Sequence, residues 1–275
     1  MSSSPPLLIT YSTTSKWPFP AGTTSSSSSN PLRIAVLDSS FNPPSRAHYA
    51  LATYTPEAFD AHLLLLSSKN VDKVPGPGDT SLEDRIAMME IMAKHMNTSD
   101  PKNFSSVAVG SLAAATFAEK APIIQDYLQA SPSHSARQEY TLIFFIGFDT
   151  VTRLFMPKYY DNSEDKMHEV LHKFFVEDKC EVICAKRPVE NVAQQDVADQ
   201  EEESFFKRPE VAKYVEMGKV TSVDIDGTVG ISSTKIRHAM KQLGSNNPDD
   251  SETELEALIQ HDILAYCREK NLYFT

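Results

Sequence analysis

The sequence predicts a single α/β domain with a doubly wound parallel sheet and helices on both faces. Short apolar runs, typical of strands, alternate along the chain with longer segments of helical periodicity. The apolar runs are continuous, as expected for strands that are buried on both faces of a sheet. With 275 residues, of which 41% are hydrophobic, the chain is long enough to bury such a core.

The expected elements follow one another in a regular order from residue 31 onward. The clearest expected helix, Leu82–Met96, repeats apolar residues with the spacing of an amphipathic helix, and Ser81 is placed to cap it. We expect strands at Leu32–Leu37, Ala61–Leu66, Ser105–Val109, Tyr140–Ile146, Cys180–Ala185 and Val220–Ile225. We expect helices at His48–Tyr54, Leu82–Met96, Ile123–Leu128, Ser232–Leu243 and Thr253–Lys270.

Residues 1–30 differ in composition from the rest of the chain. Half of them are Ser or Thr, four are Pro, and Lys16 is the only charged residue. Such a segment buries too little apolar surface to offset the entropy that it loses on ordering. The sequence therefore predicts a mobile tail ahead of a domain that spans residues 31–275. The apolar exceptions, which could dock on the domain, are Leu7, Leu8, Ile9, Trp17 and Phe19.

Two loop insertions are expected within the domain. One lies near residues 190–215, where acidic and amide side chains crowd into residues 190–203, and the other lies near residues 244–252. The tail and the acidic loop are the segments through which a protein partner would bind.

Composition excludes several classes of protein. With 26 Lys and Arg against 37 Asp and Glu, the formal charge of −11 opposes a nucleic-acid-binding role but not binding of a mononucleotide. No apolar run approaches the roughly 18 residues of a membrane span, and the N-terminus lacks the pattern of a secretion signal. Three cysteines without metal-ligand spacing are typical of a reducing compartment. We expect a cytoplasmic or nuclear protein.

The turn between the first expected strand and the first expected helix has the features of a phosphate site. It runs from Asp38 to His48 and contains two prolines that stiffen it. Ligands of open parallel sheets bind at the carboxyl ends of strands, where free N–H groups can hold phosphate oxygens. His48, about one turn into the helix, could donate to the same phosphates. An ordinary loop with an incidental histidine is the alternative.

A second candidate anion site, Gly230–Arg237, follows the last expected strand. Ser232, Ser233 and Thr234 offer hydroxyl groups beside the free N–H groups of a helix start. Arg237 lies one turn further on, where its guanidinium could reach the same anion. An ordinary helix cap followed by a surface arginine is the alternative, but two such sites on one sheet favour an anionic ligand.

A third motif follows the strongest expected strand. Gly147 would let a ligand approach the backbone closely, and Asp149 could bind a ribose hydroxyl or a metal-bound water. The alternative role for Asp149 is to cap the next helix.

Together these motifs resemble the nucleotidyltransferase superfamily with its Rossmann-like fold, and most closely the nicotinamide-mononucleotide adenylyltransferase family. The family's first motif, G-x-F-[DN]-P-x-[HT]-x-x-H, corresponds to Ser39–His48, and its last, I-S-S-T-x-I-R, is intact in Ile231–Arg237. Its central G-x-D matches Gly147 and Asp149. The resemblance spans about residues 32–275, and residues 36–44 and 147–150 are similar to a fungal branch of the family.

The resemblance implies a reaction of ATP with nicotinamide mononucleotide that gives NAD and pyrophosphate, with Mg²⁺ arriving on the ATP. It implies that His48 and Arg237 neutralise charge on the β- and γ-phosphates. It implies an ATP and phosphate site made by Ser39, Ser40, Phe41, Ser45, Lys73, Gly147, Asp149, Ile231, Ser232, Ser233 and Thr234. The expected partners are ATP and a mononucleotide, with neither nucleic acid nor a membrane.

The sequence departs from the family pattern at three places. Ser39 replaces Gly, Ser45 replaces His or Thr, and residues 105–120 lack the Trp that stacks on nicotinamide in the family. The rings that could replace this Trp are Phe104, Phe117 and Tyr127. Three alternatives to the family reaction follow from these departures. They are transfer to another phosphate ester, ATP hydrolysis without an acceptor pocket, and ATP binding by a non-catalytic scaffold.

Overall fold

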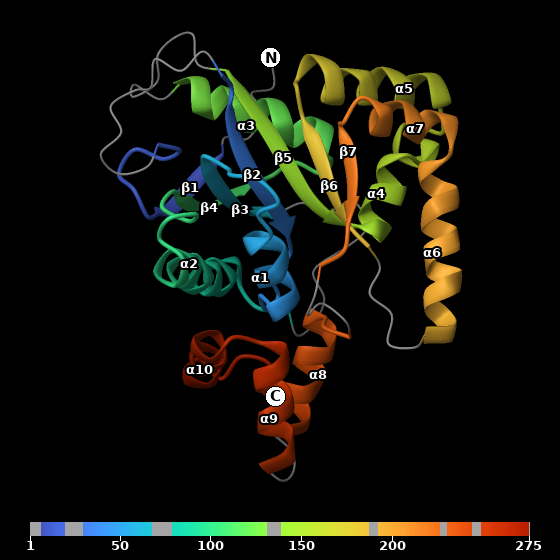
Figure 1. Ribbon diagram of the computed structural model, residues 1–275. Helices are drawn as coiled ribbons and strands as arrows, with labels where there is room; N and C mark the ends of the chain where they lie inside the picture. Colours follow the sequence, from blue (N-terminus) through green and yellow to red (C-terminus); the bar gives the residue numbers. More distant parts are fainter. Residues whose placement is uncertain are drawn as a thin grey trace.

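The computed structural model describes residues 7–19, 30–67, 79–130, 139–186, 192–225, 230–243 and 249–274. Across these residues the chain forms one seven-stranded sheet in the order β1-β4-β3-β2-β5-β6-β7 (Figure 1). β1 is antiparallel to its neighbour, and the other strands are parallel to one another. The strands are β1 Leu8–Ser12, β2 Leu32–Ser39, β3 Ala61–Ser67, β4 Val107–Leu112, β5 Tyr140–Gly147, β6 Glu181–Ala185 and β7 Val220–Val223. The predicted fold class is confirmed.

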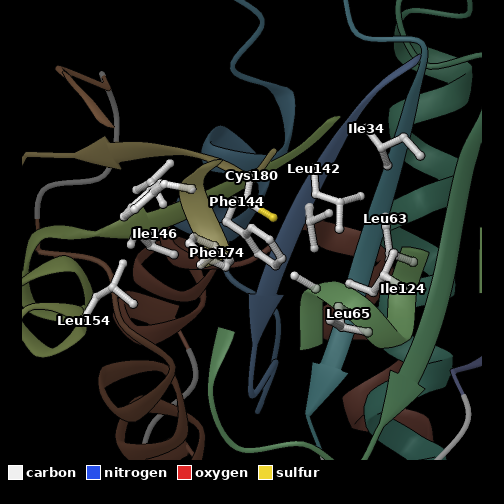
Figure 2. Close-up of a cluster of buried hydrophobic side chains, with 14 of the residues drawn as sticks. Ile34, Leu63, Leu65, Ile124, Leu142, Phe144, Ile146, Leu154, Phe174 and Cys180 are labelled. Carbon is white, nitrogen blue, oxygen red and sulfur yellow. The ribbon is translucent and has the colours of Figure 1, made fainter. Parts of the chain in front are cut away.

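Helices cover both faces of the sheet, because successive strand residues point to opposite sides. One face packs against α3, α4 and α5, and Figure 2 shows Phe144 and Ile124 among its buried side chains. The other face packs against α1, α2, α8 and α10, with the methionines of α2 at its centre. The helices and helical turns are α1 Arg46–Thr53, α2 Leu82–Ser99, α3 Phe117–Ala130, α4 Phe148–Leu154, η1 Pro157–Tyr159, α5 Glu164–His172, η2 Lys173–Glu177, α6 Val192–Phe206, α7 Pro209–Glu216, α8 Ser233–Leu243, α9 Asp249–Leu258 and α10 His261–Glu269.

The direction of winding reverses between β2 and β5. From β2 the chain builds β3 and β4 on one side, and then crosses to β5 on the other. The register that pairs Leu37 with Phe145 places Ser39 level with Gly147 at the carboxyl edge of the sheet. Open parallel sheets bind their ligands at this kind of position.

The predicted mobile tail is wrong for residues 7–19, which are part of the folded domain. β1 pairs with β4 from Leu8 opposite Ser111 to Ser12 opposite Ala108. Trp17 is 6% exposed, and its Nε1 donates to the carbonyl oxygen of His62 at 3.1 Å. The composition of the segment is that of a mobile tail, but the segment folds because it pairs with the edge of β4 and buries its few apolar side chains against the domain.

Two further predictions about irregular segments are corrected. The expected acidic loop at residues 190–203 is instead mostly helix α6, which, with α7, contributes Phe205 and Tyr214 to the core. Most of the acidic residues, Asp196, Asp199, Glu201 and Glu203, lie on the exposed side of the helix, whereas Glu202 is buried with its other side. At the other expected loop, residues 244–248 lie outside the described residues and α9 begins at Asp249.

The single helix expected at Thr253–Lys270 is two helices. α9 ends at Leu258, and Gln260 has the extended backbone of an N-cap for α10. This break lets α9 pack beside α8 and α1 while α10 packs against α2.

His62 is buried in the core, and its burial gives the stability of the fold a pH dependence. The ring packs against Phe59 and Phe104, and neither of its nitrogens has a hydrogen-bond partner among the described residues. Burial lowers the pKa of His62 from 6.5 to about 4. Between these two pH values the imidazole binds a proton in the unfolded chain but not in the folded one. The contribution of neutral His62 to the unfolding free energy is therefore fully present above pH 6.5 and is lost as the pH falls toward 4.

We expect His62 to cost the fold about 2 kcal/mol of stability when the pH falls from 7.5 to 5. Urea denaturation at both pH values should show this loss in the wild type and a smaller loss in His62→Leu. An equal loss in the two proteins would mean that other groups cause the pH dependence.

Candidate nucleotide-binding site

The turn after β2 holds His48 by both ring nitrogens. Ser45 is the N-cap of α1, and its backbone N–H donates to His48 Nδ1 at 3.1 Å while its Oγ accepts from the His48 N–H at 3.3 Å. Because Nδ1 accepts a hydrogen bond, the neutral ring carries its hydrogen on Nε2. Nε2 lies 2.8 Å from Ser39 Oγ, at the end of β2. His48 is therefore oriented toward the turn.

Phe41 fixes the shape of this turn. Its φ of 43° lies in the left-handed region that residues other than glycine rarely adopt. The side chain is fully buried, and its ring centroid lies 5.1 Å from that of His48. Ser40 is half-buried beside it. The buried ring anchors a strained backbone at the point where the sequence predicts phosphate binding.

The second motif packs directly on this turn. Ser233 Oγ donates to the carbonyl oxygen of Pro43 at 2.8 Å. Arg237 Nη1 donates to the carbonyl oxygen of Asn42 at 2.6 Å, and Arg237 Nη2 donates to Thr234 Oγ1 at 3.4 Å. The two segments are about 190 residues apart in the sequence, and these bonds make them one unit.

The start of α8 stays open beside the turn. Gly230 has φ of 66°, a conformation that glycine adopts without strain, and it leads into Ile231. Ser232 is exposed, and its Oγ accepts from the Lys235 N–H at 3.2 Å. Thr234 is exposed as well. N–H groups at a helix start favour an anion.

Gly147 and Asp149 lie next to these loops, at the end of β5. Gly147 is the N-cap residue of α4, and a Cβ added to it would meet no atom within 4 Å. Asp149 is exposed in the first turn of α4. The structure thus places open space above Gly147, as its predicted role requires.

A buried ion pair lies under the same edge of the sheet, and sequence reasoning missed its basic member. Asp38, which precedes Ser39, is bonded to Lys120 of α3, and the two side chains are 6% and 5% exposed. Ser67 Oγ, at the end of β3, donates to Asp38 Oδ1 at 2.7 Å. Nothing local in the sequence marks Lys120, because its partner lies 82 residues away.

The candidate stacking rings lie in different places. Trp17 and Phe104 are buried in the core, and Tyr127 packs beside Trp17 with ring centroids 6.4 Å apart. Phe117, the first residue of α3, follows the carboxyl end of β4 and is half-buried. Of these rings, Phe117 is the one at the ligand-binding edge of the sheet. Lys73 lies outside the described residues.

The described residues contain no group of three or more His, Cys, Asp and Glu side chains that could hold a metal ion. In this part of the chain, none of the helices has the length and apolar character needed to cross a membrane.

The doubly wound sheet, with two joined loops at its switch point, belongs to the class of open α/β folds that bind ligands at this position. No family model matches the chain. A Schizosaccharomyces pombe protein that carries the provisional name of nicotinamide mononucleotide adenylyltransferase is 32% identical over 211 residues, which cover 75% of each chain. This similarity shows that the chain belongs to the nicotinamide mononucleotide adenylyltransferase family.

Solved structures agree with this fold. Two structures of Plasmodium falciparum nicotinic acid mononucleotide adenylyltransferase, one complexed with APC and one with NaAD, match with TM-scores of 0.53 and 0.51. Each match covers 88% of this chain and at least 96% of the other, at 15% and 16% identity. Identities this low show a shared fold and nothing further.

Proposed function

We propose that the chain transfers the adenylyl group of ATP to nicotinamide mononucleotide, which gives NAD and pyrophosphate. The junction of the two loops carries this proposal, since Arg237 and Ser233 of α8 are bonded to the turn that holds His48. Family membership supports the same reaction. The backbone N–H groups of residues 39–41 and the start of α8 would bind the phosphates of ATP.

The reaction needs no protein nucleophile. An oxygen of the acceptor phosphate attacks the α-phosphorus of ATP, and the bond from that phosphorus to the bridging oxygen breaks to release pyrophosphate. The protein positions the two substrates and neutralises charge on the leaving phosphates. In this proposal His48 and Arg237 supply that neutralisation, while Gly147 and Asp149 line the nucleotide.

Mg²⁺ fits this site as a companion of the ATP. The described loops offer hydroxyl and N–H groups to phosphates, the buried Asp38 is paired with Lys120, and the exposed Asp149 could bind a metal-bound water. Mg²⁺ keeps several waters and binds through substrate phosphates in such sites, where it offsets their negative charge.

The acceptor would bind on the α3 side of the ATP. In-line attack requires the acceptor phosphate and the leaving pyrophosphate to lie on opposite sides of the α-phosphorus. Helix α8, which would hold the pyrophosphate, packs on one face of the sheet, and α3 packs on the other. Phe117 is the aromatic side chain that we propose stacks on the pyridine ring there. A nicotinate ring, with a carboxylate in place of the amide, would use the same stacking surface.

Purified full-length protein with ATP, Mg²⁺ and either mononucleotide tests the proposal. We expect the dinucleotide and pyrophosphate to form in equal amounts, and only slow phosphate release when the acceptor is left out. If phosphate release matches ATP consumption and no dinucleotide forms, the proposal is wrong.

ATP hydrolysis without transfer is the second candidate. The observation that favours it is the burial of Trp17 in the core, which removes the only Trp of the chain from any acceptor pocket. The same assay separates the two functions, because hydrolysis releases phosphate or pyrophosphate and leaves the acceptor unchanged.

Arg237→Ala should weaken ATP binding by about ten- to a hundredfold and leave AMP binding almost unchanged. In this proposal the guanidinium, about one turn from the start of α8, reaches the β- and γ-phosphates, which AMP lacks. Arg237→Lys should recover part of the loss, because an ammonium cannot form two parallel bonds. Calorimetric titration with both nucleotides measures this.

Lys241→Ala is the matched control for Arg237→Ala, because it removes one positive charge from an exposed position in the last turn of the same helix, away from the candidate anion site. We expect it to change ATP affinity by less than about threefold. Equal losses of ATP and AMP binding in Arg237→Ala would mean that Arg237 supports the helix or binds the nucleoside.

A further inference from the structure

The C-terminal segment that follows α10 reaches back to the turn between β2 and α1, residues 40–45, which we call the phosphate turn. Tyr273 donates its phenol hydrogen to Asn42 Oδ1 at 2.6 Å, across 231 residues of sequence. In Figure 1 this end of the chain lies close to α8. Asn42 is 4% exposed, so the bond forms in a protected environment. None of the motifs that predicted the site includes Tyr273.

Asn42 is held at both ends of its amide. Its Oδ1 accepts from Tyr273, and its Nδ2 donates to Asp79 Oδ1 at 2.5 Å. Asp79 in turn lies 3.7 Å from Arg85 Nη2, at the start of α2. These two bonds therefore hold the Asn42 side chain in one orientation, and this in turn restrains the backbone of Asn42.

The backbone of Asn42 orients Arg237. Its carbonyl oxygen accepts the 2.6 Å bond from Arg237 Nη1, and the next carbonyl, that of Pro43, accepts from Ser233. Phe41, the residue before Asn42, has a left-handed backbone conformation, which persists only where the surrounding structure holds it. If the Asn42 side chain lost its bond to Tyr273, the Asn42 carbonyl could shift, and Arg237, which is bonded to it, would shift as well.

We propose that Tyr273 is a positioning residue of the nucleotide site, and that its phenol, acting through Asn42, holds Arg237 toward the phosphates of ATP. This inference rests on the proposed function for the role of Arg237, but not for the contacts themselves. Burial raises the pKa of Tyr273, so the phenol stays protonated and able to donate at neutral pH.

Tyr266→Phe provides a matched control from the same segment. Tyr266 of α10 donates its phenol hydrogen to Asp84 Oδ1 at 2.9 Å, and so ties α10 to α2. Asp84 is linked to Asn42 through Thr80, by two long bonds of 3.5 Å, and makes no direct bond to the turn among the described residues. Tyr266→Phe thus removes a similar tyrosine bond and leaves the direct bonds of the Asn42 side chain to Tyr273 and Asp79 in place.

The test compares the full-length wild type, Tyr273→Phe and Tyr266→Phe by calorimetric titration with ATP and with AMP, after thermal melting confirms that each is folded. We expect Tyr273→Phe to lose about three- to tenfold in ATP affinity, the effect of one neutral hydrogen bond, and to keep its AMP affinity. Tyr266→Phe should keep both affinities. Similar losses in the two variants, or none in Tyr273→Phe, would overturn the proposal.

An Asn42→Ala background tests the route of the effect. Without the Asn42 amide, Tyr273→Phe should cause no further loss of ATP affinity, whereas an independent further loss would contradict the proposal. If Tyr273→Phe does not fold, Asp79→Ala removes the other anchor of Asn42 and should give the same selective loss. Because the readout is ATP binding, it separates this inference from the proposed transfer reaction. Selective loss of ATP affinity in a protein that forms no dinucleotide would leave the positioning role standing and the transfer role refuted.

Discussion

Deletion of residues 1–19 is expected to cost at least about 5 kcal/mol of unfolding free energy, which is comparable with the whole stability of many domains. The deletion removes β1 from the edge of the sheet and takes Leu7, Trp17 and Phe19 out of the core. Emptying the site of a buried Trp or Phe alone typically costs about 3–5 kcal/mol. The melting temperature should fall by more than about 10 °C, or the truncated protein should not fold.

Two point variants separate the contribution of the core from that of the strand. Trp17→Ala should cost about 3–5 kcal/mol, while Leu8→Ala on the same segment should cost less than about 1 kcal/mol because Leu8 is 60% exposed. Thermal melting of both variants checks this. An unchanged melting temperature after the deletion would restore the mobile tail that composition predicts.

His48→Ala is expected to lower adenylyl transfer by about a hundredfold, or about 3 kcal/mol in the transition state, with a smaller effect on ATP affinity. Ser45 holds Nδ1, so the hydrogen on Nε2 points to Ser39 at the phosphate turn. There it can exchange its bond for one to a phosphate oxygen as negative charge builds up during transfer. Steady-state kinetics at saturating ATP measures the effect.

His48 also completes the cap of α1, and His48→Gln separates this role from catalysis. Gln at the third helical position preserves a capping box with Ser45 but has no imidazole. We expect the His48→Gln protein to melt like the wild type and to transfer as slowly as His48→Ala. Near-normal turnover in either folded variant would remove His48 from the mechanism.

Six of the seven strands that the structure describes, and the position of both candidate phosphate loops, could be predicted because their signals are local. Most of the six expected strands are largely apolar runs, and each of the six appears in the sheet within a few residues of its expected bounds. The loops were visible because Ser39–His48 and Ile231–Arg237 are contiguous motifs that follow strands. Strand ends on one sheet edge bring such loops together without further information.

The remaining features depend on partners that are remote in sequence. β1 gains its burial from β4, Lys120 its role from Asp38, and Tyr273 its bond from Asn42. The composition of residues 1–30 measures only what that segment can bury by itself. The acidic run at residues 190–203 misled for a related reason, because the buried residues Phe205 and Tyr214 lie beyond it.

The pairing of β1 with β4 also fixes an order of events during protein synthesis. The partner of β1 is made about 100 residues later, which at roughly 5–20 residues per second is a delay of about 5–20 s. During this time Trp17 and Phe19 have no core to enter, so the nascent chain presents an apolar segment near its beginning. The edge of the sheet that this strand covers is therefore closed only after β4 has left the ribosome, and a chaperone that binds short apolar segments has that interval in which to act.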